Sequence, residues 1–370
     1  MRKITLDIGF SPGDIVVFTR AIRDLCEQYP DYDVEIKTCC PEIFQNNPYV
    51  NKKPKAQEPE VIPIADNLTK DGYDIAEVAT NAQSLFRELV RESKLSAEFK
   101  DGNWYYKKNG LDLFYCKQKK QPVFERETFP QVQYEDIHQS GDSIKHFSSA
   151  FYTELNQKLG VKIKQTSLLP DLHLSEEEKG WVNQVEQVFN YKGKFWLICS
   201  GYKSDFPLKN WGHDNWQKVV DLLNDKVQFV QVGQITGGHT HEPLKGTLNL
   251  LGKTDLRQLI RLTYHAEGGC GHVSLLHHLM AAWQKPMVTV AGGREPRVWE
   301  QYPHGRYMDT LGQLYCCAYN GCWLDGRIKD GENKMCENMV GNRPRCMQMI
   351  KPERVAEEIA NYQYFEGDIS

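Results

Sequence analysis

Two features are missing from this 370-residue sequence, and each absence excludes a class of protein. No apolar run approaches the roughly 18 residues that a membrane-spanning helix needs. The opening residues, MRKITLDIGF, lack the apolar stretch of a secretory signal. We therefore predict a cytoplasmic protein with no transmembrane segment.

Basic residues are not in excess either. The chain has 45 Lys and Arg against 49 Asp and Glu, a formal net charge of −4. This balance provides no overall basic surface for a nucleic-acid backbone, although a local basic cleft is compatible with it. A nucleic-acid partner is therefore disfavoured. The composition, with 40% hydrophobic and 25% charged residues, predicts a well-packed core, and the length suits two domains.

The sequence contains eleven cysteines but no paired Cys-x-x-Cys motif. Scattered cysteines such as Cys26, Cys116 and Cys199 are typical of small core residues. Five others fall in residues 316–346, a loop-rich segment without apolar periodicity. Such a segment commonly depends on a metal or on cross-links, and in a reducing compartment a Cys₄ site for zinc, or for iron, is favoured over disulfides or free thiols. The four ligands that we predict are Cys317, Cys322, Cys336 and Cys346, with Cys316 in reserve.

Hydrophobic patterns predict an α/β protein in two halves. KITLDIG reads as a strand with a glycine turn, DIVVFTRAIRDLCEQYP as a helix and DVEIKTC as a second strand, which is the start of a parallel sheet. Residues 41–120 are less regular, and we expect further strands and helices there. From residue 195 the pattern repeats in the strands KFWLICSG, VQFVQVGQ and PMVTVAGG and the helices between them.

The predicted domains are residues 1–165 and 166–350, the second including the Cys-rich segment 316–346. Residues 351–370 are predicted to form a helix that packs back on the first domain. Two such α/β halves would leave a cleft between the carboxyl ends of their strands, where open parallel sheets bind ligands.

Asp14 follows a Pro-Gly turn where the first helix begins. Taken alone, it is a typical helix cap, favoured there by the helix dipole. A carboxylate in this place also suits general-base catalysis if an acceptor hydroxyl reaches it, and Gly13 allows a ligand to approach the backbone. Which of the two roles applies depends on whether the second half supplies a donor site.

Candidates for a donor site follow the strands of the second half. Lys203 and Lys209 lie on the loop after the strand that ends near Ser200, where they could meet a diphosphate. A glycine-rich turn precedes the helix that contains Ser274 and His278, and a helix N-terminus is a ready anion site. Ser274 and His278 share a helix face, whereas His277 points elsewhere. For His278, a core role and a ligand contact are equally compatible with the pattern.

Four segments together resemble the ADP-heptose lipopolysaccharide heptosyltransferases, glycosyltransferase family nine. They are SPGDIVVFTRAIRDLCEQYP, PLKNW, LGKTDLRQLIRL and HLMAAWQKPMVTVAGG. This resemblance implies a GT-B fold of two Rossmann-like domains, the first holding the acceptor and the second the nucleotide-sugar. It also implies an inverting transfer that needs no catalytic metal.

Position by position, the resemblance assigns Asp14 as the general base and Lys203 or Lys209 as the phosphate-contacting lysine. Thr254 falls in the segment that lines the nucleotide, and Ser274 and His278 fall beside the diphosphate. The predicted donor-binding set is Gly13, Ser200, Lys203, Lys209, Thr254, Ser274 and His278.

Val273 is a departure from the family, because it stands where members have an acidic residue near the donor. The Cys-rich segment resembles the metal-bearing finger of heptosyltransferases that act on autotransporter proteins, and four thiolates would make such a site structural. We therefore expect an ADP-linked heptose or related sugar as donor, and a glycan, lipopolysaccharide core or protein as acceptor. The alternatives are glycosylation of a modified DNA base and an inactive relative that binds nucleotides or glycans.

Overall fold

The computed structural model describes most of the chain. The described residues are 2–51, 60–73, 84–86, 88–89, 94–100, 103–117, 126–135, 145–204, 206–326, 328–329, 332–333 and 335–366. The chain divides into a large unit, residues 1–52 and 126–370, and a small unit, residues 53–125.

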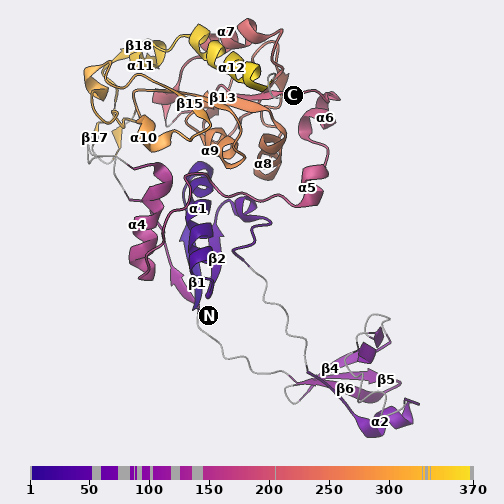
Figure 1. The fold of residues 1–370 in the computed structure, drawn as a ribbon. Coiled ribbons are helices and arrows are strands. Elements are labelled where there is room, and N and C mark those ends of the chain that lie inside the picture. Colours follow the sequence, from indigo (N-terminus) through magenta and orange to yellow (C-terminus); the bar gives the residue numbers. More distant parts are fainter. Residues whose placement is uncertain are drawn as a thin grey trace. The chain divides into compact units, whose positions relative to one another are not determined.

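The large unit begins with a parallel three-stranded sheet in the order β2-β1-β7. Its central strand β1 has fully buried Ile4, Leu6 and Ile8. Helix α1 follows β1 directly, and α4 packs on α1 (Figure 1). The bounds are β1 Arg2–Ile8, α1 Pro12–Gln28, β2 Tyr32–Thr38, η1 Pro41–Phe44, β7 Glu127–Phe129 and α4 Phe147–Leu159.

Helix α1 begins where local sequence chemistry favours a start. Ser11 is the N-cap, Pro12 occupies the first helical turn, and Asp14 accepts hydrogen bonds from both the backbone N–H and the hydroxyl of Ser11. The helix then buries an apolar face that includes Phe18 and Ile22. It ends just before Pro30, which cannot continue a helix.

The second half of the large unit is built on a six-stranded parallel sheet in the order β12-β10-β8-β13-β14-β15. The chain runs outward from β8 to β12, returns to β13 beside β8, and runs outward again. Ligands bind at such a switch point, outside the carboxyl ends of the strands, here β8 and β13. The strands are β8 Trp196–Cys199, β10 Phe229–Gln231, β12 Leu248–Asn249, β13 Gly268–His272, β14 Met287–Gly292 and β15 Gly305–Asp309.

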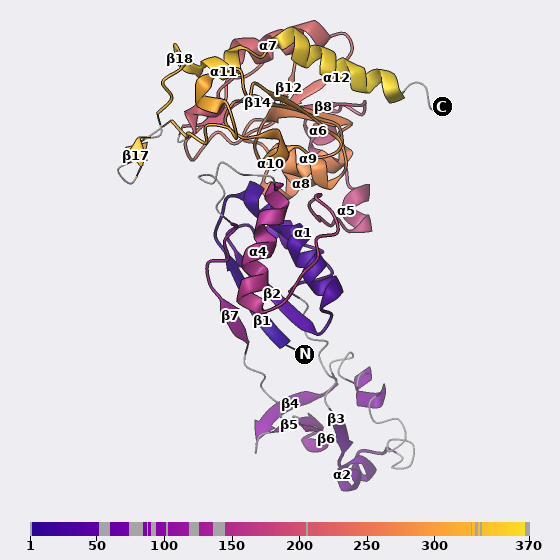
Figure 2. The same ribbon diagram turned by 60° about the vertical axis from the view of Figure 1, so that its left-hand side comes forward.

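Helices and short hairpins surround this sheet (Figures 1 and 2). The helices are α5 Glu176–Gly180, α6 Gln184–Phe189, η2 Pro207–Lys209, α7 His213–Leu223, α8 Leu256–His265, α9 Leu275–Ala282, α10 Arg297–Glu300, η3 Tyr315–Cys317, α11 Arg345–Gln348 and α12 Pro352–Glu366. Two hairpins are β16 Ile328–Lys329 with β17 Glu332–Asn333, and β18 Met339–Val340 with β19 Arg343–Pro344. A further antiparallel pair joins β9 Tyr202–Lys203 to the more distant β11 His239–Thr240.

Helix α12 lies on the second half. It packs against α7 and β14, and its Val355 and Ile359 are buried in one hydrophobic cluster with Trp216 and Val220 of α7. From the sequence we expected residues 351–370 to pack back on the first half. The described part of the helix instead covers α7, because the apolar faces of these two helices match.

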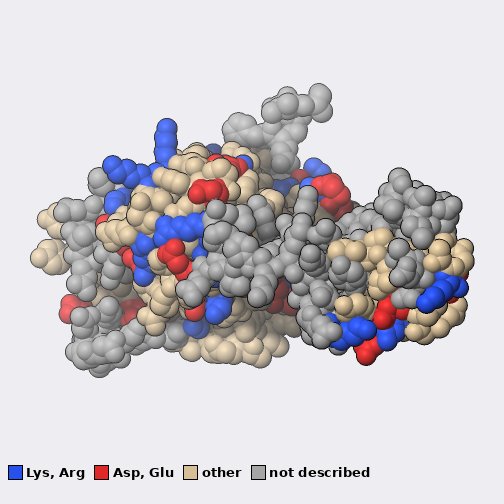
Figure 3. All heavy atoms as spheres, turned by 90° about the horizontal axis from the view of Figure 1, so that it is seen from below, with Lys and Arg blue, Asp and Glu red and all other residues tan. Residues whose placement is uncertain are grey.

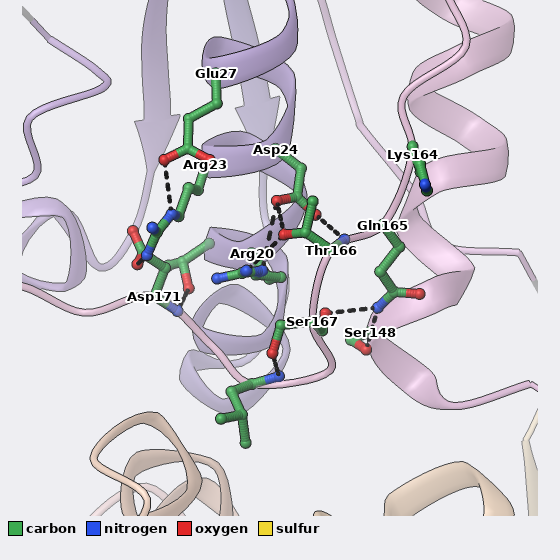
Figure 4. A network of polar contacts seen from close by, with 12 residues as sticks. Arg20, Arg23, Asp24, Glu27, Ser148, Lys164, Gln165, Thr166, Ser167 and Asp171 are labelled. Carbon is green, nitrogen blue, oxygen red and sulfur yellow. Dashed lines mark hydrogen bonds and ion pairs between the residues drawn. The ribbon is translucent and has the colours of Figure 1, made fainter.

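The segment that leads from the first half to the second is tied to α1 by polar contacts (Figure 4). Buried Asp24 accepts hydrogen bonds from the hydroxyl and the backbone N–H of Thr166, at 2.6 and 2.9 Å. Arg23 forms an ion pair with Asp171 at 2.8 Å. These contacts fix the connection against the helix whose N-terminus holds Asp14.

The small unit is an antiparallel sheet in the order β3-β6-β5-β4 with helix α2. Its core contains Leu68, Phe86, Leu89, Leu113 and Phe114. The sequence interpretation did not separate this unit from the first domain. The side chain of Cys116 lies outside the described part of the structure. The elements are β3 Glu60–Pro63, α2 Ala65–Lys70, β4 Ser96–Lys100, β5 Asn103–Lys108 and β6 Leu111–Lys117.

Candidate functional site

The N-terminus of α1 meets the N-terminal part of α9, so the two halves of the large unit contact each other at this point (Figure 1). Gly13 lies against this contact. A Cβ atom on Gly13 would lie 3.2 Å from Cδ2 of His278 and 3.7 Å from Cα of Leu275. Glycine therefore permits the close approach that places Asp14, the next residue, beside the second half.

The carboxyl group of Asp14 is half-buried, and burial raises its pKa above the ordinary value. The two hydrogen bonds from Ser11 and the positive charge of Lys209 oppose this rise, and the negative charge of Glu295 adds to it. Lys209 and Glu295 therefore lie within electrostatic reach of Asp14. A carboxylate with a raised pKa is a better proton acceptor, as a general base requires.

Lys209 stands at the end of η2 and bridges two loops at the carboxyl edge of the second sheet. Its ammonium donates a hydrogen bond to the carbonyl of Val273 at 3.2 Å and pairs with a carboxylate oxygen of Glu295 at 2.8 Å. The side chain of Val273 packs with Ala291 and Tyr307, so this residue meets Lys209 through its backbone. The charge of Lys209 also acts on the predicted base Asp14, whose pKa it lowers.

Glu295 and Arg294 complete the charged group around Lys209, and sequence reasoning missed both. They follow β14 directly, and Glu295 is buried and paired with both Lys209 and Arg294. The signal was present in the sequence, because REP comes straight after the predicted strand PMVTVAGG, at a carboxyl end where ligand-binding groups gather.

His278 is 4% exposed, and its Nδ1 lies 3.0 Å from the hydroxyl of Tyr302. Burial lowers the pKa of His278 well below its ordinary value, so the ring is neutral at neutral pH. Ser274, the N-cap of α9, makes no capping hydrogen bond through its side chain. Contacts of these two residues with a donor stay predictions.

His277, His278 and Glu300 bring three potential ligand atoms within 4.8 Å of one another, and they are the one such group in the part of the chain that the structure describes. Both ring nitrogens of His277 are already engaged, Nδ1 with the hydroxyl of Thr289 and Nε2 with the carbonyl of Glu300, each at 2.8 Å. Since a carbonyl can only accept, Nε2 donates to Glu300, and the lone pair of Nδ1 accepts the hydrogen bond of Thr289, so no lone pair of the ring is left free for a metal. This group therefore fits a hydrogen-bonded core better than a metal centre.

The five cysteines of segment 316–346 have free thiols and lie in one region of the second half. Cys317 is buried, and its thiol donates to the carbonyls of Thr310 and Leu314. Burial raises the pKa of Cys322 to about 12 and of Cys346 to about 11. The thiols described here are not gathered within the 4.8 Å found for the histidine group, so a Cys₄ site stays a prediction.

The remaining predicted donor residues are spread over the carboxyl edge of the second sheet. Ser200 accepts a hydrogen bond from Gln231 at 2.9 Å and lines a pocket of about 80 Å³. That volume is below the roughly 300 to 1,000 Å³ of typical ligand sites. Lys203 lies opposite His239 in the antiparallel pair of strands β9 and β11. Thr254 immediately precedes the N-cap of α8. Their donor contacts also stay predictions.

A larger pocket of about 380 Å³ lies at the outer strand β15, and it contains none of the predicted site residues. Ion pairs occupy its lining, including Arg297 with Asp309 at 2.9 Å and Arg354 with Glu358 at 2.7 Å. The charged residues near Asp14 include the predicted Lys209, and Gly13 beside Asp14 lies at the contact between the two halves, so this region is the better candidate for chemistry.

The fold is of the GT-B type, the two-lobed architecture of many glycosyltransferases. Residues 146–317 match the model of glycosyltransferase family 9 (heptosyltransferase). The resemblance drawn from the sequence is thereby confirmed over this segment. Curated proteins give no sequence match.

Solved structures of glycosyltransferases share the fold of the chain at low identity. The family 9 glycosyl transferase of Veillonella parvula is 12% identical, with a TM-score of 0.55 over 97% of this chain and 96% of that one. ADP-heptose lps heptosyltransferase II of E. coli is 17% identical, with a TM-score of 0.53 over 98% and 99%. The iron-containing dodecameric glycosyltransferase TibC of enterotoxigenic E. coli is 14% identical, with a TM-score of 0.54 over 98% and 77%.

The fold predicted from the sequence, α/β with two Rossmann-like halves, is therefore confirmed. In the described part of the chain, every helix falls short of the length or the apolar content needed to cross a bilayer.

Proposed function

We propose that the chain is an inverting glycosyltransferase that transfers a heptose or related sugar from a nucleotide-sugar, most simply ADP-linked, to a hydroxyl group. The acceptor is a glycan, a lipopolysaccharide core or a protein side chain. The observation that carries this proposal is that Gly13, the neighbour of Asp14 at the start of α1, packs against His278 and Leu275 of α9, while the charge of Lys209 acts on the half-buried carboxyl group of Asp14. A TibC structure in complex with ADP-D-beta-D-heptose supports an ADP-linked donor.

In this mechanism Asp14 accepts the proton of the acceptor hydroxyl. The hydroxyl oxygen then forms a bond to the anomeric carbon of the donor as the bond from that carbon to the diphosphate breaks. Attack from the face opposite the diphosphate inverts the configuration of the anomeric carbon. The raised pKa of Asp14 increases its proton affinity, which favours this step.

The leaving diphosphate needs positive charge. Lys209 provides an ammonium group, and the N-terminus of α9, whose N-cap residue is Ser274, provides backbone N–H groups and the positive end of the helix dipole. This arrangement requires no catalytic metal ion. Ser200, Lys203, Thr254 and His278 are the further donor contacts that we propose, with Gly13 giving the donor room beside the backbone.

We further propose that Cys317, Cys322, Cys336 and Cys346, with Cys316 in reserve, hold one structural iron or zinc ion. The iron in TibC, which shares this fold, supports iron. Such an ion would stabilise a loop-rich segment that has little apolar core of its own and would leave no open position for substrate. Elemental analysis of the purified protein tests this, and less than about one metal ion per two chains contradicts it.

A donor screen tests the proposed transfer. Purified protein is incubated with ADP-, UDP- and GDP-linked sugars and candidate acceptors, and products are read by mass spectrometry. We expect nucleoside diphosphate release and a sugar-mass increase on the acceptor with the ADP-linked heptose. Nucleotide binding without transfer from any donor would instead support the binding-protein alternative.

A further inference from the structure

The Cys-rich segment runs alongside the loop that carries Glu295. The backbone N–H of Cys322 donates to the carbonyl of Gly293 at 3.1 Å, and that of Trp323 donates to the carbonyl of Arg294 at 3.3 Å. The guanidinium of Arg294 in turn donates to the carbonyl of Leu324 at 2.6 Å. Three hydrogen bonds therefore fix the two residues that precede Glu295 to the Cys-rich segment.

The contact is tight enough to require glycine. A Cβ atom on Gly321, where φ is +80°, would lie 2.2 Å from the carbonyl oxygen of Arg294. A Cβ atom on Gly326 would lie 2.7 Å from Cγ of Pro207, in the short helix that ends at Lys209. The same segment therefore packs against the loop that carries Glu295 and against the short helix that carries Lys209.

Glu295 itself is 5% exposed and sits between two cations. One carboxylate oxygen pairs with the ammonium of Lys209 at 2.8 Å and with the guanidinium of Arg294. Lys209 and Arg294 both lie near the ring of Phe206, at 5.8 and 5.1 Å from its centroid. A buried carboxylate with fixed partners can hold a lysine in one orientation, whereas an exposed one cannot.

We propose that Glu295 is a positioning residue that fixes the ammonium of Lys209 at the carboxyl edge of the second sheet, and that the Cys-rich segment acts on the reaction by holding Glu295 through Arg294. This rests on the proposed roles of Asp14 and Lys209. In this proposal the Cys-rich segment contributes to sugar transfer as well as to the stability of the fold.

The role of Glu295 can be measured through the pH dependence of sugar transfer. The groups that act on Asp14 are Ser11 on its own helix, Lys209 of η2, and Glu295 and Glu300 from the loop and helix after β14. His278 of α9, beside Gly13, is neutral. Removing the negative charge of Glu295 lowers the pKa of Asp14, because that charge raises it. The acid limb of kcat/KM must therefore move to lower pH.

Glu295→Gln tests the proposal, with Glu178→Gln as matched control. Glu178 is also buried and paired with an arginine, Arg257 at 2.6 Å, but in α5. With ADP-heptose as donor, we expect Glu295→Gln to lower kcat/KM roughly ten- to a hundredfold and to shift its acid limb downward, since small misplacements of a catalytic group cost this much. Glu178→Gln should lower the melting temperature and leave the limb in place. Equal pH profiles for both variants would overturn the proposal.

A glycine pair tests the link to the Cys-rich segment. Gly321→Ala forces the segment away from Arg294, whereas Gly341→Ala introduces a side chain at a similar positive φ, +63°, with nothing within 4 Å. We expect Gly321→Ala, which displaces Arg294 and with it Glu295, to lower kcat/KM and to move its acid limb, and Gly341→Ala to leave both unchanged. Identical effects of both substitutions would contradict the claim that the Cys-rich segment holds Glu295 through Arg294.

A carbon-13 NMR titration of Asp14 separates this inference from the proposed function, because it needs no turnover. If wild-type protein transfers no sugar but the pKa of Asp14 still falls in Glu295→Gln, the inference about the charged group stands and the proposed function fails. An unchanged pKa of Asp14 contradicts the inference whether or not the protein transfers sugar.

Discussion

The two halves of the site are held in different ways. Asp14 is fixed by its neighbours in sequence, since Ser11 binds its carboxylate and Pro12 starts the helix. Lys209 is fixed by residues 64 and 86 positions away, through the carbonyl of Val273 and the carboxylate of Glu295. The proposed base is thus positioned by local chemistry, and the proposed phosphate-contacting cation by tertiary packing. Substitutions close in sequence should therefore affect the position of Asp14, whereas substitutions in distant loops should affect that of Lys209.

The largest expected effect is that of Asp14→Asn. The amide keeps the size of the side chain but cannot accept the acceptor proton, so transfer should fall by about two to four orders of magnitude while donor affinity stays close to wild type. Product formation by mass spectrometry and ADP binding by calorimetry check this. Asp31→Asn, a change at an exposed aspartate, is the control. Full activity of Asp14→Asn would show that another group is the base.

Removal of Lys209 should come next in size. Lys209→Ala takes away the cation proposed for the leaving diphosphate and leaves buried Glu295 without one of its two partners. We expect kcat/KM to fall about a hundredfold. Steady-state kinetics against Lys218→Ala, an exposed lysine paired with Glu353, provide the comparison. Equal rates for these two variants would be incompatible with the assigned role of Lys209.

Cys322→Ser should lower the rate of transfer by an intermediate amount, because it acts on the site only through tertiary contacts. If Cys322 is a ligand, bound metal falls below half of the wild-type content and the loop at Gly293 loosens, which lowers transfer about tenfold. Cys26→Ser, in the first half, should change neither quantity. Metal content and turnover are measured on the same samples. Loss of metal with unchanged turnover would confine the ion to a role in stability.

The smallest effect on transfer is expected from Ser11→Ala, which removes one of the local hydrogen bonds to Asp14. The hydroxyl of Ser11 lowers the pKa of Asp14, so its loss raises that pKa and moves the acid limb of kcat/KM to higher pH. The maximal rate should change by no more than a few fold, because the backbone N–H of Ser11 still binds the carboxylate. Ser11→Thr, which keeps the hydroxyl, should leave the limb in place.

The same division explains how much of the site could be predicted from the sequence. The start of α1, the parallel strands and the position of Asp14 follow from a capping serine, a proline and apolar periodicity, all of which act over a few residues. Glu295 follows a correctly predicted strand, but its pairing with Lys209 depends on how two loops meet.

Packing between distant elements was harder still. The match between the apolar faces of α12 and α7 cannot be read from either helix alone, and the predicted contact of residues 351–370 with the first half missed it. His278 left a core role and a ligand contact equally open in the sequence, and its burial beside Tyr302 depends on residues of α10 and the loop after it.

The pH dependence of kcat/KM in Ser11→Ala and Glu295→Gln, measured beside wild type, tests the central claim most directly. If Asp14 is the base and is tuned from both halves, the acid limb moves to higher pH in Ser11→Ala and to lower pH in Glu295→Gln. An acid limb that stays at the wild-type pH in both variants would contradict the account.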